Sequence, residues 1–134
     1  MFGALDISTS GLIAQRTRLE VVAANLAGEH TLLNEAGEYE PFRRRFAVLA
    51  AGDPESRAAK GVHVARIETD TGPLVPRYEP WSDLADAEGY VLYPNVNRVV
   101  EQMNAMEAAR SYEANIAAIE ATKSMMSIAL QIMA

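Results

Sequence analysis

The sequence predicts an α+β fold: long N- and C-terminal helices form an antiparallel, coiled-coil-like pair, and a small β-rich module is inserted between them. Three observations support this prediction. Apolar residues recur at helical spacing in the first 27 residues, proline and glycine interrupt the middle of the chain, and neither occurs between Val96 and Met133. With 134 residues, of which 49% are hydrophobic, the chain is long enough for about one domain with its own core.

The first predicted helix runs from Leu5 to Ala27. Its leucines recur every seventh residue, with Val22 at an intermediate site, which is a helical period and not a strand period. These leucines are Leu5, Leu12, Leu19 and Leu26. Gly28 follows directly and predicts a helix stop in the left-handed region. Gly11 costs about 1 kcal/mol relative to alanine, so it indicates either close helix packing or a segment that orders only on assembly.

The middle of the chain, residues 29–94, is punctuated by prolines that exclude a long helix. They are Pro41, Pro54, Pro73, Pro76, Pro80 and, at the border, Pro94. Three short runs rich in β-branched and aromatic residues predict strands, at Arg45–Leu49, Val62–Ile67 and Tyr90–Tyr93. Residues Ala51–Lys60 are predicted to form a loop.

The second helix is predicted from Val96 to Met133, with Asn95 as its N-cap after Pro94. It would be about 57 Å long at about 1.5 Å per residue, more than the N-terminal helix can cover. We therefore divide the chain into a terminal-helix assembly domain, residues 1–28 with 95–134, and a β-rich middle module, residues 29–94.

The C-terminal helix carries two adjacent stripes whose members are spaced three and four residues apart, as in a coiled coil. One stripe is Ile116, Ile119, Lys123, Met126, Leu130 and Met133, and the other is Ala114, Ala118, Ala121, Met125, Ile128 and Ile132. One stripe can pack within the chain, so the other requires a partner outside it. The sequence therefore favours an assembly subunit over an enzyme.

Lys123 stands in the first stripe, where an apolar residue would pack better. One interpretation is that it fixes the register of the helices, paired with Glu20 or with an acidic residue of a neighbouring subunit. The favoured interpretation is that its stem lies along the stripe and its ammonium reaches solvent.

Two other groups of residues leave alternatives open. The cationic run Arg43 to Arg45 fits a solvated strand flank or a contact to an acidic neighbour better than a nucleic-acid site. The methionines Met103, Met106, Met125 and Met126 fit either a core or a surface that adapts to non-identical neighbours.

Composition and charge exclude several functions. The net charge of -6 argues against a nucleic-acid or anionic-membrane partner. The chain has no cysteine, and no apolar run approaches the length of a membrane-spanning helix, even in the tail from Ser124. The N-terminal residues lack the features of a secretory signal, so any export is expected to proceed without cleavage.

No catalytic, cofactor or metal site is expected. His30 and His63 belong to no ligand-spaced pair, and the acidic run from Asp83 has alanines where calcium ligands are needed. Phosphate-binding loops, nucleophile elbows and paired catalytic carboxylates are missing from the sequence.

Two sets of motifs resemble bacterial flagellar rod and hook proteins. The N-terminal set is SGLIAQ at Ser10–Gln15 and RLEVVAANLA at Arg18–Ala27. The second set is similar to the proximal rod proteins of this family: LADAEGYV at Leu84–Val91, YPNVN at Tyr93–Asn97, ARSYEANI at Ala109–Ile116 and KSMM at Lys123–Met126. The residues Gly28, Glu29 and His30 depart from the pattern usual at the end of the N-terminal motif.

The resemblance implies a structural subunit of the basal-body rod, the axial shaft that crosses the periplasm. In that family the terminal helices build the inner tube around the export channel, and the middle module lies outside. The implied partners are other rod subunits, further copies of the chain and the flagellar type III export apparatus. The alternatives are a cytosolic coiled-coil adaptor or export chaperone and, more weakly, a cell-wall lytic enzyme, which the missing carboxylate pair disfavours.

The expected assembly interface consists of apolar residues on both terminal helices, together with Lys123. They are Leu5, Leu12, Leu19, Val22, Leu26, Ile116, Ile119, Lys123, Met125, Met126, Ile128, Leu130, Ile132 and Met133.

Overall fold

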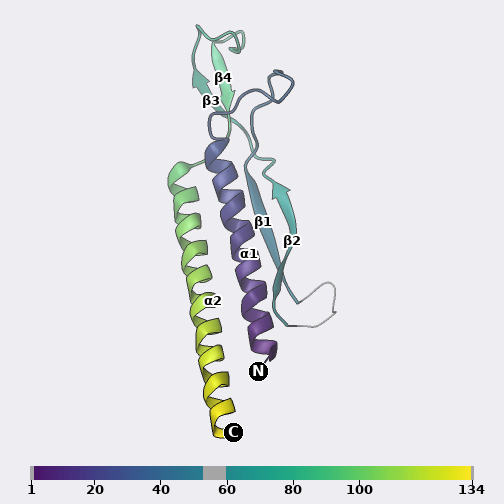
Figure 1. Cartoon of the computed structure of the whole chain (residues 1–134). Helices are drawn as coiled ribbons and strands as arrows, with labels where there is room; N and C mark the ends of the chain where they lie inside the picture. The colour runs from purple at the N-terminus through teal and green to yellow at the C-terminus, as the bar shows by residue number, and fades with distance from the viewer. Residues whose placement is uncertain (1, 53–59, 134) are drawn as a thin grey trace.

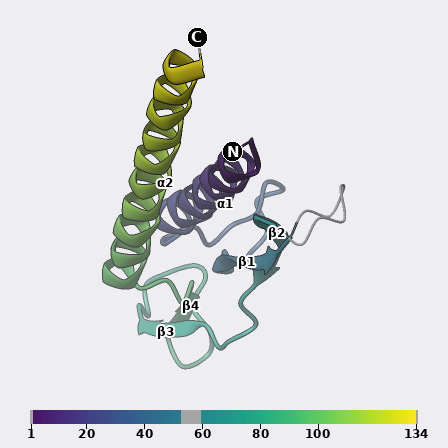
Figure 2. The ribbon, with the colours of Figure 1, turned by 90° about the horizontal axis from the view of Figure 1, so that it is seen from below.

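The computed structural model describes residues 2–52 and 60–133 and confirms the predicted α+β class. The elements in chain order are α1 (Phe2–Ala27), β1 (Arg45–Ala51), β2 (Val62–Thr69), β3 (Val75–Tyr78), β4 (Tyr90–Tyr93) and α2 (Arg98–Met133). The two helices run antiparallel, side by side, and β3 and β4 lie at one end of the pair (Figure 1). Viewed along the molecule, α1 lies between α2 and the β1–β2 hairpin (Figure 2).

The end of α1 differs from the sequence prediction. Gly28 is not among the glycines with positive φ, which in the described residues are Gly37, Gly52, Gly61 and Gly89. Its amide still donates to the carbonyl of Ala24, at 2.9 Å, so the helical hydrogen-bond pattern continues to Gly28. The prediction of a left-handed stop is therefore wrong. Glycine is needed for space, because a Cβ there would lie 2.6 Å from the ring of Phe42.

The start of α2 is capped by Asn97 and not by Asn95. The Asn97 Oδ1 accepts hydrogen bonds from the amides of Val99 and Val100, at 3.0 and 3.2 Å. These two amides are among those that a helix leaves without an internal partner. Both asparagines are suitable caps by residue type, and the helix begins two residues later than predicted.

All three predicted strands form, with longer bounds for β1 and β2. They belong to two separate two-stranded antiparallel sheets, β1–β2 and β3–β4. Strand β3 was not predicted, and it contains Pro76, one of the prolines used to exclude a long helix. Proline is tolerated there because a two-stranded sheet consists only of edge strands. Most of the predicted loop 51–60 lies outside the described residues.

The core lies around α1, which packs on two sides. Ala14, Val21 and Val22 are buried along it, and Ala108 is fully buried on α2. Gly11 is also buried, and a Cβ there would lie 2.8 Å from the Nδ2 of Asn115 on α2. The interpretation of Gly11 as a point of close helix packing is therefore confirmed.

The face of α2 that packs on α1 is not either of the predicted stripes. The buried or half-buried positions are Glu101, Asn104, Ala105, Ala108, Ala109, Ser111, Tyr112, Asn115, Ile119, Thr122, Met126 and Ala129. Only Ile119 and Met126 come from the first stripe, while every member of the second is exposed. Small and polar residues form most of this inner face. As a consequence, both apolar stripes remain largely unused within the chain.

Candidate assembly surfaces

A buried polar network joins α1, β1 and α2 near one end of the helix pair. The Asn25 amide nitrogen donates to the Arg45 carbonyl, at 2.8 Å, and to Glu101 Oε2, at 3.0 Å. In return, the Arg45 amide donates to Asn25 Oδ1, at 2.9 Å, so Asn25 pairs with β1 as a neighbouring strand would. The network fixes how far α2 can slide along α1.

The charge of Glu101 is compensated by Arg44. Glu101 is only 1% exposed, and its Oε1 accepts a hydrogen bond from Arg44 Nε at 2.7 Å. A buried carboxylate needs such a partner, because the loss of hydration costs several kcal/mol. Among the described residues, no buried side-chain nitrogen or oxygen lacks a hydrogen-bond partner. Arg44 therefore pairs with an acidic residue of its own chain, while Arg43 and Arg45 are exposed, and a contact of the run with a neighbouring subunit stays a prediction.

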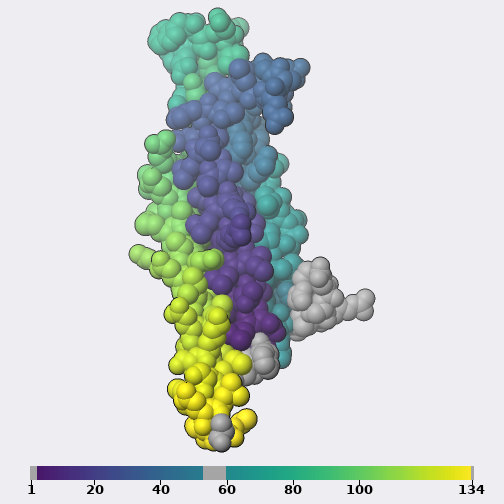
Figure 3. All heavy atoms as spheres, viewed as in Figure 1, coloured from purple at the N-terminus to yellow at the C-terminus, as the bar shows by residue number. Residues whose placement is uncertain are grey.

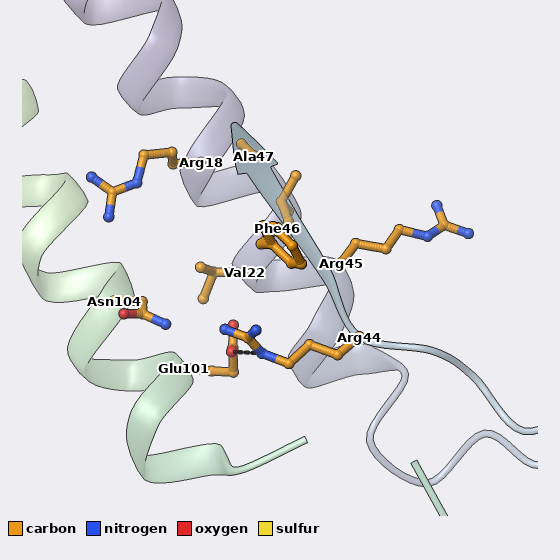
Figure 4. A pocket seen from close by; sticks show the side chains of 9 residues that line it. Arg18, Val22, Arg44, Arg45, Phe46, Ala47, Glu101 and Asn104 are labelled. Carbon is orange, nitrogen blue, oxygen red and sulfur yellow. Dashed lines mark hydrogen bonds and ion pairs between the residues drawn. The ribbon is translucent and has the colours of Figure 1, made fainter. Parts of the chain in front are cut away.

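A shallow pocket of about 210 Å³ opens beside this network (Figure 4). Arg44 points toward Glu101, whereas the Arg45 side chain points away from the pocket and lies over the Phe42 ring at 5.7 Å. Arg18, on the α1 wall, reaches the exposed carboxylate of Glu107 at 3.8 Å. Arg18 and Arg44 thus connect α1 and the chain just before β1 to α2.

Two apolar clusters on α2 are exposed. The first comprises Val99, Val100, Met103 and Met106, with exposed fractions between 45% and 65%. A groove of about 390 Å³ runs between Met103, Met106 and Arg110. The exposure of Met103 and Met106 favours the interpretation as an adaptable surface over that as core.

The second cluster lies on the last turns of α2. Met125, Ile128 and Leu130 are more than half exposed, and Ile132 and Met133 are 80% exposed. The end of α2 extends past the N-terminal end of α1, so no helix of the same chain covers it (Figure 1). The sequence-based expectation that the N-terminal helix covers only part of its partner is confirmed.

The expected interface residues therefore fall into three groups. Those exposed are Ile116, Lys123, Met125, Ile128, Leu130, Ile132 and Met133; those half-buried are Leu5, Leu12, Leu19, Leu26, Ile119 and Met126; and Val22 is buried. Val22 belongs to the core of the subunit and has no surface to offer a neighbour. The polar network was missed, because Asn25 and Glu101 are of residue types normally found at the surface.

Other sequence-based candidates have local structural roles. The His63 Nδ1 lies 2.7 Å from the Gly52 carbonyl, and the ring of His30 packs edge-on against Tyr93. The Asp86 carboxylate accepts hydrogen bonds from the amides of Glu88 and Tyr90 and thereby shapes a turn. Within residues 2–52 and 60–133, no three side chains of the metal-binding types cluster, and neither helix is apolar enough over a sufficient length to cross a membrane.

Comparison with known proteins identifies the family. The family described as "Flagella basal body rod protein" matches residues 5–27, and "Flagellar basal body rod FlgEFG protein C-terminal" matches residues 87–132. The chain is 42% identical over 121 residues to the flagellar basal-body rod protein FlgC of Salmonella typhimurium, covering 90% of this chain and 89% of that protein. The chain belongs to the FlgC family.

More distant FlgC proteins match over nearly the whole chain. The Bacillus subtilis protein is 38% identical and the Borreliella burgdorferi protein 34%, each covering at least 98% of this chain and 97% of its own length. As a FlgC protein, the chain is a structural subunit of the flagellar basal-body rod. The alternative of an adaptor or export chaperone gains no support from these relatives.

Proposed function

We propose that this FlgC protein assembles helically, with further copies of itself and with other rod subunits, into the axial drive shaft around the export channel. The observation that carries the proposal is the uncovered apolar surface of α2. Among the described residues, ten large apolar side chains of α2 are exposed, against two on α1. Apolar surface of that extent on one element marks an interaction site.

The geometry of the two helices favours an open-ended assembly. One face of α2 is occupied by α1, and the exposed residues Met125, Ile128 and Ile132 lie outside that contact. One surface of a subunit can bind a different surface of the next subunit. Repeated contacts of this kind build an open helical filament when the rotation from one subunit to the next does not close a ring. Such contacts propagate along a shaft, as transmission of torque requires.

We assign separate roles to two parts of the chain. Residues 1–28 with 95–134 form the assembly domain, and residues 29–94 form a module on the outside of the rod. The polar network between Asn25, Arg44 and Glu101 supports this assignment, because it holds the first strand of the module in a fixed position against both helices.

We further propose export by the flagellar type III apparatus without removal of the N-terminal segment. Ser10 supports this, because its hydroxyl accepts a hydrogen bond from the Val62 amide at 3.1 Å and so holds the hairpin to α1. Loss of the first residues would remove this contact. Mass spectrometry of the N-terminus in purified rods tests the proposal, and a shortened chain would contradict it. Cofactors, nucleic acids and membrane insertion have no part in the proposed function.

A pair of substitutions on the α2 tail tests the assembly surface. Ile128→Asp with Ile132→Asp places two charges on the exposed apolar side, and we expect a folded, exported subunit that forms no rods. The matched control is Ser127→Asp, a charge at a neighbouring exposed polar position, which should leave rods intact. Normal rods with the double variant would contradict the proposal. Circular dichroism of the purified variants confirms that folding is unchanged.

A further inference from the structure

The β3–β4 sheet has an uncovered apolar face. Pro76 pairs with Leu92 and Tyr78 with Tyr90, and residues directly opposite each other in an antiparallel pair lie on the same side of the sheet. Tyr78 is 62% exposed, and Tyr90 and Leu92 are about 40% exposed. The two tyrosine rings pack edge to face, with centroids 5.3 Å apart. We call these four residues the outer face.

The opposite side of the same sheet is packed at its β4 residues, whereas Val75 on β3 is 40% exposed. This side carries Val91, which is fully buried, and Tyr93, whose ring lies 4.3 Å from the Arg77 guanidinium. The Tyr93 hydroxyl donates to the Glu79 carboxylate, and burial together with this bond raises the pKa of Tyr93. The outer face lacks such cover within the described residues. Trp81, just after β3, adds a ring that is 82% exposed.

This end of the molecule carries strong negative charge. We define the head as residues 30–42 and 73–96, which the hydrogen bond between the Tyr39 hydroxyl and the Leu92 carbonyl ties together. It holds seven of the 18 acidic residues and one of the 12 basic residues, Arg77. The head therefore accounts for a net charge of -6, which is the charge of the whole chain. The rest of the chain has no net charge, because its acidic and basic residues are equal in number.

The opposite end has the complementary character. The α2 tail, residues 121–133, carries exposed Met125, Ile128 and Ile132, and its single charge is the exposed Lys123. The other lysine of the chain is Lys60. It precedes Gly61, and Gly61 packs on Ser10 in the first half of α1. The molecule is elongated, with the head at one end and the tail at the other (Figure 3). Head and tail of one chain therefore cannot meet.

We propose that the outer face of the head binds the α2 tail of a second copy of this chain, a contact that rests on the proposed assembly function. Methionine side chains pack favourably against aromatic rings, which matches Met125 and Met133 to Tyr78, Tyr90 and Trp81. Lys123 then lies against the acidic head. Because the two surfaces are different, the contact can repeat head to tail from copy to copy, and it builds an open helix when the rotation between copies does not close a ring. Aromatic residues such as Trp81 often dominate the affinity of an interface.

Disulfide cross-linking tests this contact, because the chain has no cysteine of its own. Tyr78→Cys and Ile132→Cys are expressed as two differently tagged full-length copies in cells that build flagella, and rods are oxidised before isolation. We expect a cross-linked dimer that carries both tags. The control is Arg77→Cys, an exposed neighbour on the other side of the same strand, which should cross-link at least about tenfold less. Leu92→Cys provides a second outer-face position if Tyr78→Cys fails to fold.

A charge reversal provides the second measurement. Lys123→Glu should lower the yield of the cross-link about fivefold, the scale of one exposed ion pair, whereas Arg110→Glu, farther up α2, should not. Intact rods without the head-to-tail cross-link would overturn this inference and leave the proposed function standing. Equal yields with Arg77→Cys and Tyr78→Cys would also overturn it. Intact rods formed without the α2 tail would overturn the proposed function itself.

Discussion

The two helices of this FlgC protein are partners in one pair, yet their surroundings differ. α1 has α2 on one side and the β1–β2 hairpin on another, and Ala14, Val21 and Val22 are buried along it (Figure 2). α2 is longer and has α1 alone, so in 36 residues only Glu101 and Ala108 are buried. Its inner face is made mostly of small and polar residues, and most of its large apolar side chains are exposed.

This difference separates folding from assembly. The side chains that fold the subunit are concentrated on α1 and its neighbours, while the apolar residues of α2 are left for contacts between subunits. A subunit built this way stays monomeric only while its α2 surface has no partner, which suits a protein that assembles at its destination. If the two sets of residues are separate, a substitution should impair either the stability of the subunit or the assembly of rods, and not both.

The largest expected effect is the loss of rods on removal of residues 124–134. The deletion takes the exposed Ile128, Ile132 and Met133 and leaves the polar network and the hairpin untouched. We expect a soluble, exported protein, unchanged in thermal unfolding to within a few degrees, in non-motile cells without rods. Swimming of the deletion strain at the normal rate would show that the tail is not an essential interface.

Removal of the Glu101 carboxylate should have the opposite effect to removal of the tail: the isolated subunit should lose stability. Glu101→Ala leaves Arg44 and Asn25 without their acceptor, and breaking a buried pair costs about 3 kcal/mol or more. For a chain of this size the melting temperature should fall by roughly 10 °C. The control is Glu107→Ala, which removes an exposed pair with Arg18 and should cost less than about 1 kcal/mol. Similar losses for both variants would contradict the role assigned to the network.

The sequence was enough to predict the helices and most of the strands, but not the contacts between them. Helix periodicity and the proline-rich middle predicted both long helices and three of the four strands, and the family motifs predicted a rod subunit. The register of α2 on α1 was missed, because Ala105, Ala108 and Asn115 form its inner face and a search for apolar stripes passes over them. Asn95 and Asn97 are equally good caps by type, so only the path of the chain after Pro94 decides between them.

Gly28, just past the end of α1, and Gly3, near its start, form a pair that separates packing from helix propensity. A Cβ at Gly28 would lie 2.6 Å from the Phe42 ring, so Gly28→Ala should destabilise by about 1–3 kcal/mol. A Cβ at Gly3 would meet no atom within 4 Å, so Gly3→Ala should be neutral or stabilise by up to about 1 kcal/mol. Chemical denaturation measures both. A stabilised Gly28→Ala protein would show that Phe42 does not pack there in solution.

Hydrogen exchange should reveal a gradient along α2 in a verified monomer. Amides between Glu101 and Asn115, where α1 covers the helix, should be protected far longer than amides between Lys123 and Met133. The reason is that the uncovered turns keep their backbone hydrogen bonds without tertiary contacts. In assembled rods the gradient should disappear. Uniform strong protection in the monomer would mean that the tail is stable without a partner.

Lys123→Leu should have the smallest effect and decides between the two interpretations of this residue. Lys123 is exposed, so it holds no register within the subunit, and the variant should change monomer stability by less than about 0.5 kcal/mol. If its ammonium only reaches solvent, rods and motility should be normal, because an exposed side chain of this kind contributes little. Electron microscopy of isolated rods is the measurement. Irregular rods built from a normally stable monomer would instead show that Lys123 fixes the register between subunits, as a single polar residue does in a coiled-coil seam.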